Sequence, residues 1–324
     1  MVNVLVTGGA GYIGSRLIPR LLKENYSVTV LDNFMYGQSS LLECCSDPNF
    51  SVVRGDCRDE LILKPLVEKA EVIIPLAALV GFPLCDKDKM AAVSTNLQAI
   101  QSMLQWRSLQ QRVLISCTNS GYGIGSEGKY CTEETPMNPI SLYGKTKVQA
   151  ENFILSFLKK KRFNVCILRL ATIFGLSPRM RFDLLINQFT KDALMKKPLS
   201  LESPCAWRPF LHVQDAARAL IYCLQVPVTK ISGEIFNVGC GNYQKKEIAQ
   251  LIKKHIPGTD IKMSAGAEDS RDYKVSFAKV KKRLGFKTKF SLERGIVEIK
   301  QAIETGIIDD PESEKYSNLK VNHE

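Results

Sequence analysis

The chain has 324 residues, of which 45% are hydrophobic and 24% charged, the balance of an ordinary globular protein. No apolar run approaches the roughly 18 residues that a membrane-spanning helix needs, and the first residues, MVNVLVTGG, have the pattern of a strand and not of a signal peptide. We therefore expect a cytoplasmic protein with no membrane partner, long enough for one large domain or two unequal ones.

The ten cysteines and three histidines have no spacing typical of a zinc site, so we expect reduced thiols and no metal ion. The formal net charge of +11 favours anionic ligands. Two basic runs, 159–162 and 279–283, fall where amphipathic helices are expected to end. We interpret them as solvent-facing, and expect no nucleic-acid partner. The polar tail, 309–324, is expected to be frayed.

Short β-branched runs alternate with helical patterns through the first half of the chain, the pattern of βαβ units in a parallel sheet. The expected strands cover 2–7, 27–32, 50–55, 71–77, 112–116 and 164–170. Helical periodicity begins after Gly11 and recurs over 61–69, 90–106 and 141–160. This order predicts an α/β fold of the Rossmann type, a doubly wound parallel sheet that binds ligands at the carboxyl ends of its strands.

After residue 175 the alternation weakens into irregular segments rich in Arg, Pro and Ser, around a helix expected over 184–195. A further buried strand, 233–239, is expected to return to the main sheet. We therefore expect a large N-terminal nucleotide-binding domain and a smaller, discontinuous C-terminal lobe that binds substrate, with the active site between them. Their expected bounds are 1–176 with 209–240 for the domain, and 177–208 with 241–308 for the lobe.

A glycine-rich turn follows the first strand, in the sequence TGGAGYIGS. Gly8, Gly11 and Gly14 form a GxxGxxG pattern that lets the backbone approach a pyrophosphate, and the helix that follows offers free N–H groups and a favourable dipole. Asp32, at the end of the second strand, is placed to accept hydrogen bonds from the adenosine ribose and to repel a 2′-phosphate. The combination predicts NAD as cofactor, and not NADP.

Further cofactor contacts are expected at the neighbouring strand ends. Asp56 is placed either to accept from the adenine amino group or to cap the turn that follows. Ala77 and Ala78 leave room for the cofactor, and Ser116 is expected near the nicotinamide. The other expected contacts are Tyr12, Ile13, Asn33, Cys57, Leu76 and Asn96.

Tyr143 and Lys147 lie at i and i+4, on one face of an expected helix. A free tyrosine has a pKa of about 10, too high for an efficient base at neutral pH, and a nearby ammonium group lowers it. We interpret Tyr143 as a catalytic base, and Lys147 as the group that lowers its pKa and holds the nicotinamide ribose.

With these motifs the chain resembles the extended short-chain dehydrogenase/reductases that act on nucleotide sugars. The resemblance covers nearly the whole chain and rests on TGGAGYIG, Asp32, the LAA segment, the YxxxK pair, RPFLHVQDAARA and IFNVG. It implies that Tyr143 removes a proton from a sugar hydroxyl while hydride passes to NAD, with the Thr118 hydroxyl orienting substrate and phenolate. It also implies a homodimer packed through the helices at 90–106 and 141–160.

Within this family the residue two positions before Tyr122 differs between reaction types. Dehydratases and glucuronic acid decarboxylases resembling this fold carry a Glu there and 3,5-epimerases a Cys, whereas this chain has Asn119 and Ser120. The pattern favours reversible oxidation at one ring carbon, most often C4, by a dehydrogenase or an epimerase. A dehydratase or decarboxylase is the alternative within the family. A non-catalytic nucleotide-sensing or RNA-binding Rossmann protein is the alternative of another class.

The segments IIPLAALVGFPLC, TNSGYGIG and RLATIFGLSPRMRFDLLINQFT resemble bacterial GDP-heptose C4 dehydrogenases. The resemblance also implies that Arg208 and Arg271 bind the diphosphate of the nucleotide sugar, since guanidinium groups suit phosphate oxygens. His212 is expected to pack between the lobes. The other expected substrate contacts are Thr118, Asn119, Ser120, Arg181, Asn187 and Thr172, the last standing where the family frequently has Asn.

Overall fold

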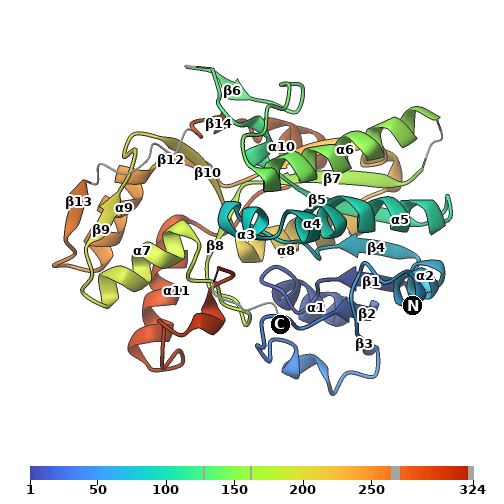
Figure 1. Cartoon of the computed structure of the whole chain (residues 1–324), viewed down its shortest axis with the longest axis horizontal. Coiled ribbons are helices and arrows are strands. Elements are labelled where there is room, and N and C mark those ends of the chain that lie inside the picture. The colour runs from blue at the N-terminus through green and yellow to red at the C-terminus, as the bar shows by residue number, and fades with distance from the viewer. Residues whose placement is uncertain (127, 161–162, 264–270, 320–324) are drawn as a thin grey trace.

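The structure is a computed structural model that describes residues 1–126, 128–160, 163–263 and 271–319 (Figure 1). Its centre is a parallel sheet of seven strands in the order β11-β7-β5-β4-β1-β2-β3. These strands are β1 (Asn3–Thr7), β2 (Ser27–Asp32), β3 (Phe50–Arg54), β4 (Val72–Pro75), β5 (Arg112–Thr118), β7 (Val165–Leu170) and β11 (Glu234–Val238). The strand order reverses between β1 and β4, where a doubly wound sheet opens a crevice for a ligand. The predicted Rossmann-type fold is confirmed.

Alternating side chains of each strand serve two separate cores, one on either face of the sheet. Val4 and Val6 of β1 join one core, whereas Leu5 between them joins the other. All six residues of β7 are buried, since helices cover both faces of a parallel sheet. One face is covered by α1 (Gly14–Lys23), α8 (Val213–Gln225) and α10 (Ala278–Leu284), and the other by α2 (Glu60–Lys69), α5 (Ala99–Trp106) and α6 (Leu142–Lys160).

The helical pattern predicted over 90–106 is interrupted by one wide turn. It consists of α4 (Lys89–Val93), a π-helical turn, η2 (Ser94–Gln98), and α5. Turns of this kind are frequent at functional sites, and this one lies beside the cavity described below. A short helix that the periodicity did not reveal, α3 (Phe82–Lys87), precedes it.

The C-terminal lobe lies at the left of Figure 1, around α7 (Leu185–Leu194), α9 (Lys245–His255) and α11 (Leu292–Glu304). Phe174, Phe210 and Ile296 are buried in its core. The expected return strand lies at β11 in the main sheet, whereas β10 (Trp207–His212) pairs within the lobe.

Three smaller sheets complete the fold. They pair β8 (Thr172–Phe174) and β12 (Gly241–Gln244) with β10, β9 (Leu199–Leu201) with β13 (Ile261–Met263), and β6 (Tyr130–Cys131) with β14 (Lys274–Val275). Short 3-10 turns are η1 (Leu42–Cys44), η3 (Asn119–Tyr122), η4 (Val228–Lys230) and η5 (Glu314–Tyr316).

The tail, expected to be frayed, is packed against the protein over its described part, 309–319. The Phe182 N–H donates to the Tyr316 carbonyl (2.7 Å), and the two rings meet edge to face. Tyr316 also packs against a buried cluster that contains Ile308 and Met180. The expectation of a frayed tail is therefore wrong for this part, because its apolar residues find a buried surface; 320–324 lie outside the described residues.

In their described part the basic runs face solvent as expected, since Lys159, Lys281, Lys282 and Arg283 are exposed. In the run at 279–283, Lys279 and Arg283 both pair with Glu234, at 2.9 Å each. Residues 161–162 of the other run lie outside the described residues. Among the described helices, none has the length and apolar character needed to cross a bilayer.

Candidate active site

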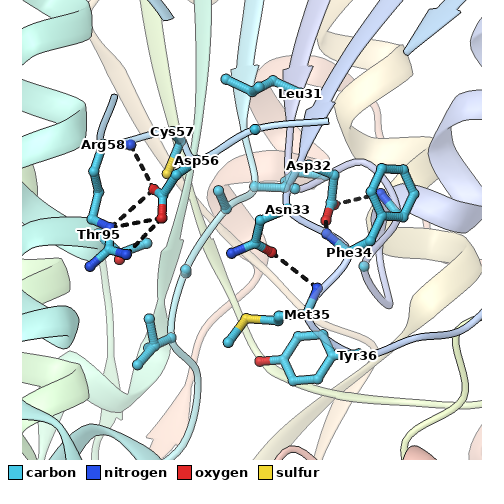
Figure 2. Close-up of a pocket in the computed structure, with 18 of the residues that line it drawn as sticks. Leu31, Asp32, Asn33, Phe34, Met35, Tyr36, Asp56, Cys57, Arg58 and Thr95 are labelled. Carbon is cyan, nitrogen blue, oxygen red and sulfur yellow. Dashed lines mark hydrogen bonds and ion pairs between the residues drawn. The ribbon is translucent and has the colours of Figure 1, made fainter. Parts of the chain in front are cut away.

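A cavity of about 210 Å³ lies at the carboxyl ends of the central strands (Figure 2). The predicted cofactor residues that line it are Gly8, Gly11, Asp32, Asn33, Asp56, Cys57, Leu76, Ala77 and Ala78. The predicted residues that do not line it are Tyr12, Ile13, Gly14, Asn96, Ser116, Tyr143 and Lys147. Nine of the predicted cofactor residues thus line one cavity and the helix of Tyr143 lies beside it, whereas the cofactor contacts themselves stay predictions.

The glycine turn brings the chain close to two neighbouring segments. Gly8 has a φ of +71°, and a Cβ built on it would lie 2.5 Å from the backbone nitrogen of Ala77. A Cβ on Gly14 would overlap the backbone of Gly9. No side chain caps the start of α1, and the positive end of the helix dipole there favours an anion. This turn fits a dinucleotide diphosphate.

Asp32 is held with its carboxylate at the cavity. Its Oδ2 accepts from the Ala10 N–H (2.9 Å) and its Oδ1 from the Phe34 N–H (2.8 Å). Burial raises the pKa of Asp32, and these two N–H groups act in the opposite direction. The carboxylate keeps lone pairs for ribose hydroxyls, which fits NAD.

Asp56 lies across the cavity from Asp32, with Asn33 between them (Figure 2). Its Oδ1 accepts from the Arg58 N–H (2.8 Å), so it caps the turn that follows β3. Its carboxylate also forms an ion pair with the Arg58 guanidinium (2.6 Å), which lowers the pKa of Asp56. The turn-capping role is therefore present, and an adenine contact stays a prediction. Arg58, which the sequence analysis missed, also lines the cavity.

The helix α6 carries Tyr143 and Lys147 and packs beside this cavity. Tyr143 contacts a cluster that contains Leu79, a cavity residue. Burial raises the pKa of Tyr143 above its ordinary value, whereas the charge of Arg181 and a hydrogen bond with Thr118 act in the opposite direction. Burial also lowers the pKa of Lys147. The net direction for Tyr143 is opposite to the expected lowering, because desolvation, the largest cause, disfavours its charged form.

The strand end TNSGYG turns two hydroxyl groups toward each other. The Oγ1 of Thr118 lies 2.9 Å from the Oγ of Ser120 and accepts from the Ser120 N–H (3.1 Å). The amide of Asn119 instead donates to the Arg169 carbonyl (3.0 Å), which lies on β7 of the main sheet. The buried Ser116 hydroxyl has no hydrogen-bond partner within the described residues. Thr118 and Ser120 thus form the polar surface beside Tyr143.

A buried ionic network supports this strand end, and the sequence analysis missed it. Arg169 pairs with Glu151 at 2.5 Å, and its Nη1 donates to the Tyr122 hydroxyl (2.8 Å). Glu151 follows Lys147 by four residues, so it continues the helix face of Tyr143. That spacing was the signal that could have revealed it.

Arg208 and Arg271, the predicted diphosphate ligands, are connected through hydrogen bonds of their neighbours Trp207 and Asp272. The buried Arg208 donates from Nη1 to the Trp207 carbonyl, and the Trp207 N–H donates to Asp272 Oδ1, both at 2.8 Å. Asp272 follows Arg271, and its carbonyl accepts from the Gly125 N–H (2.8 Å). These bonds bring Arg208 and the segment of Arg271 close to Gly125, which follows the end of β5. Thr172 lies on β8, the strand next to Arg208's β10.

Two asparagines expected to bind ligands use their amides inside the protein. Asn96 donates to the Leu79 carbonyl and accepts from the Leu79 N–H, both at 2.9 Å. Asn187 accepts from the Gly175 N–H (2.9 Å) and donates to the Tyr12 hydroxyl (2.9 Å). Both amides therefore hold loops in place, and their ligand contacts stay predictions.

Arg181, another expected substrate contact, is buried and paired with Asp183 (2.6 Å). The charge of Arg181 nevertheless acts on Tyr143. His212 lies between the lobes as expected, with its ring stacked on Phe290 and its Nε2 2.8 Å from Glu298. In the described part of the chain, no group of His, Cys, Asp and Glu side chains is arranged to hold a metal ion.

Comparison with known proteins gives one consistent result. Residues 4–239 match the NAD dependent epimerase/dehydratase family. Low-salt glycan biosynthesis protein Agl12 of Haloferax volcanii is 30% identical over 307 residues, which cover 91% of this chain and 96% of that protein. UDP-glucuronic acid decarboxylase 2 of Arabidopsis thaliana is 27% identical over 310 residues; the match covers 91% of this chain but 66% of that protein.

A solved structure gives the same result. UDP-glucuronic acid 4-epimerase from Bacillus cereus, in complex with UDP-glucuronic acid and NAD, matches with a TM-score of 0.83 and 26% identity, over 93% of this chain and 100% of that chain. The family match, the glycine turn and the Asp32 carboxylate together confirm NAD as the cofactor. This chain belongs to the NAD dependent epimerase/dehydratase family and is an enzyme of the extended short-chain dehydrogenase/reductase class.

Proposed function

We propose that this enzyme oxidises one ring carbon, most often C4, of a nucleotide diphosphate sugar, as a dehydrogenase or an epimerase. The observation that carries the proposal is the hydroxyl pair Thr118–Ser120 at the end of β5, where dehydratases and decarboxylases of the family carry a carboxylate. The acid on the helix of Tyr143, Glu151, is buried in its ion pair with Arg169. The chemistry that remains needs one base and one hydride acceptor.

In this proposal Tyr143 takes the proton of the sugar hydroxyl at its phenolic oxygen. NAD, when bound, supplies the acceptor for the hydride that leaves the same carbon. Because burial raises the pKa of Tyr143, its phenolate depends on stabilisation by the Thr118 hydroxyl and by the positive charge of Arg181. Lys147, buried on the same helix face, is proposed to hold the nicotinamide ribose.

The nucleotide diphosphate is proposed to bind Arg208 and Arg271. Asn187 is proposed to bind the linking phosphate or the base, and Thr172 and Arg181 are further proposed substrate contacts. Guanidinium groups hold their charge at any working pH and match phosphate oxygens. The resemblance of the pocket segments favours a GDP-sugar, whereas the B. cereus epimerase binds UDP-glucuronic acid. We further propose a homodimer in the cytoplasm, and the domain bounds given above.

A decarboxylase or dehydratase is the second candidate, because a UDP-glucuronic acid decarboxylase is among the relatives that match along most of this chain. The test is a panel of nucleotide sugars with NMR analysis of products and measurement of NADH. Accumulation of NADH identifies a dehydrogenase. A new stereoisomer formed without net change in the redox state of the cofactor identifies an epimerase. Loss of CO₂ or water would overturn the proposal. Binding without turnover on any sugar would make the chain a non-catalytic sensor.

A further inference from the structure

The segment 175–183 is hydrogen-bonded to α1, the helix that follows the glycine turn. The Oγ of Ser177 lies 2.9 Å from the Oγ of Ser15, and Arg16 donates from Nε to the Leu176 carbonyl (3.0 Å). The Arg179 N–H also donates to Ser15 Oγ (3.3 Å). These contacts place Arg179 beside the start of α1, where the helix dipole favours an anion and no side chain caps the helix.

Arg179 is a buried cation in the wall of the cofactor cavity. Its side chain is 1% exposed and lines the cavity together with Gly11 and Asp32. Its guanidinium lies 3.9 Å from the ring centroid of Tyr36. Its Nε has no hydrogen-bond partner among the residues that the structure describes. Burial, and then the charge of Arg181, lower the pKa of Arg179 to about 10, so an anion in the cavity would stabilise its charged form.

The neighbouring carboxylates are engaged elsewhere. Asp183 pairs with Arg181 through both of its oxygens. Asp32 accepts from two backbone N–H groups. A buried guanidinium with an unused donor favours a polar partner, since an unsatisfied buried donor destabilises the protein. Arg179 lines the cavity, so a ligand bound there can supply a polar partner to this side chain.

The C-terminal segment 309–319 holds Arg179 in this position. The buried Asn318 accepts at Oδ1 from Arg179 Nη2 (2.5 Å). Gln38, a cavity residue, accepts from the Met180 N–H (2.9 Å) and donates to the Lys315 carbonyl. The tail thus contacts the loop after β2 and the segment of Arg179 at the same time.

We propose that Arg179 binds the diphosphate of the cofactor, and that the C-terminal segment 309–319 positions it through Asn318, so that the tail forms part of the NAD site. The inference rests on the NAD of the family and not on which sugar is oxidised. A nucleotide sugar also contains a diphosphate. The cofactor is favoured as its source because Arg179 shares its cavity with Asp32 and the glycine turn.

The test is equilibrium binding to the full chain, freed of co-purified nucleotide, with ADP-ribose, adenosine and UDP as probes. Arg179→Gln should weaken ADP-ribose binding by about tenfold to a hundredfold, the effect of one charged hydrogen bond. Adenosine, which lacks phosphate, should bind as before by ligand-observed NMR, and UDP should be unaffected. Arg179→Lys should recover part of the affinity for ADP-ribose.

Asn318→Ala should weaken ADP-ribose binding by a smaller factor, and the double variant should bind no more weakly than Arg179→Gln alone. Ser317→Ala is the control, since among the described residues the one recorded partner of its hydroxyl is the Leu319 N–H on the same tail. Equal losses for adenosine and ADP-ribose would show a structural role only and overturn the proposal. A loss confined to UDP would assign Arg179 to the substrate and also overturn it. If Arg179→Gln does not fold, Arg179→Lys and Asn318→Ala provide the same comparison.

Discussion

The Nη2 of Arg169 lies 2.5 Å from the Oε1 of Glu151, and both side chains are almost fully buried below the strand end that carries Thr118. The pair joins β7 to α6, the helix that carries Tyr143. Because the Tyr122 hydroxyl also bonds Arg169 and Asn237, the network reaches β11 as well. The position of Tyr143 relative to Thr118 therefore depends on charges that do not themselves reach the cavity.

Glu151→Gln should lower the free energy of unfolding by about 3 kcal/mol, since it leaves a buried guanidinium without its counter-charge. Urea unfolding followed by circular dichroism measures this change. Lys197→Gln, which breaks an exposed ion pair with Glu312, is the matched control and should behave like the wild type. A Glu151→Gln protein as stable as the wild type would show that the pair contributes little.

Tyr143→Phe should reduce turnover by about a hundredfold to ten-thousandfold, because the phenolic oxygen that takes the proton is lost. NAD binding should be unchanged, since the cofactor cavity is lined by other residues. Tyr130→Phe, at a 55% exposed tyrosine, is the control. Substantial residual turnover would remove Tyr143 from its proposed role.

Thr118→Val should move the rising limb of the pH profile of kcat/KM to higher pH. The hydrogen bond from Thr118 lowers the pKa of Tyr143, so its loss leaves the raised pKa still higher and the phenolate scarcer at a given pH. Each unit of that displacement costs about tenfold in rate below the pKa. Ser120→Ala, which keeps the Thr118 hydroxyl, should displace the limb less. An unmoved limb in Thr118→Val would contradict this assignment.

Arg208→Ala should weaken binding of the nucleotide sugar by about tenfold to a hundredfold and leave NAD binding unchanged. Calorimetric titration with UDP and GDP separates the two nucleotides. Arg283→Ala, on α10 and paired with Glu234, is the control for losing one positive charge. Unchanged affinity for both nucleotides would discard the proposed diphosphate contact.

Local sequence patterns were sufficient for the main sheet and for bringing Gly8, Asp32 and Ala77 to one cavity. The strand runs alternate with helical ones, and the glycine turn and Asp32 have fixed places in that order. The roles of Asn96 and Asn187 could not be predicted, because their partners are loops that only tertiary folding brings near. The pKa of Tyr143 was misjudged for a similar reason: helical spacing shows that Lys147 is near, but not how far burial removes both groups from water.

The tail shows a second limit of local pattern. Its composition is polar, yet Tyr316 and Asn318 are held by Phe182 and Arg179, distant residues in the sequence. A polar segment is ordered when its few apolar and amide groups pack against a complementary surface. The composition of the segment cannot predict that surface, because distant residues form it.

After β7, in the main sheet, the chain passes to the three-stranded sheet at β8 and β10 (Figure 1). It returns to the main sheet at β11 and then adds β12 to the three-stranded sheet. A fragment that stopped after β7 would lack its neighbour in the sheet and expose an unpaired edge to association with other chains. The two lobes are therefore interleaved and not serial. We expect them to melt in one cooperative transition, and limited proteolysis to give no stable half.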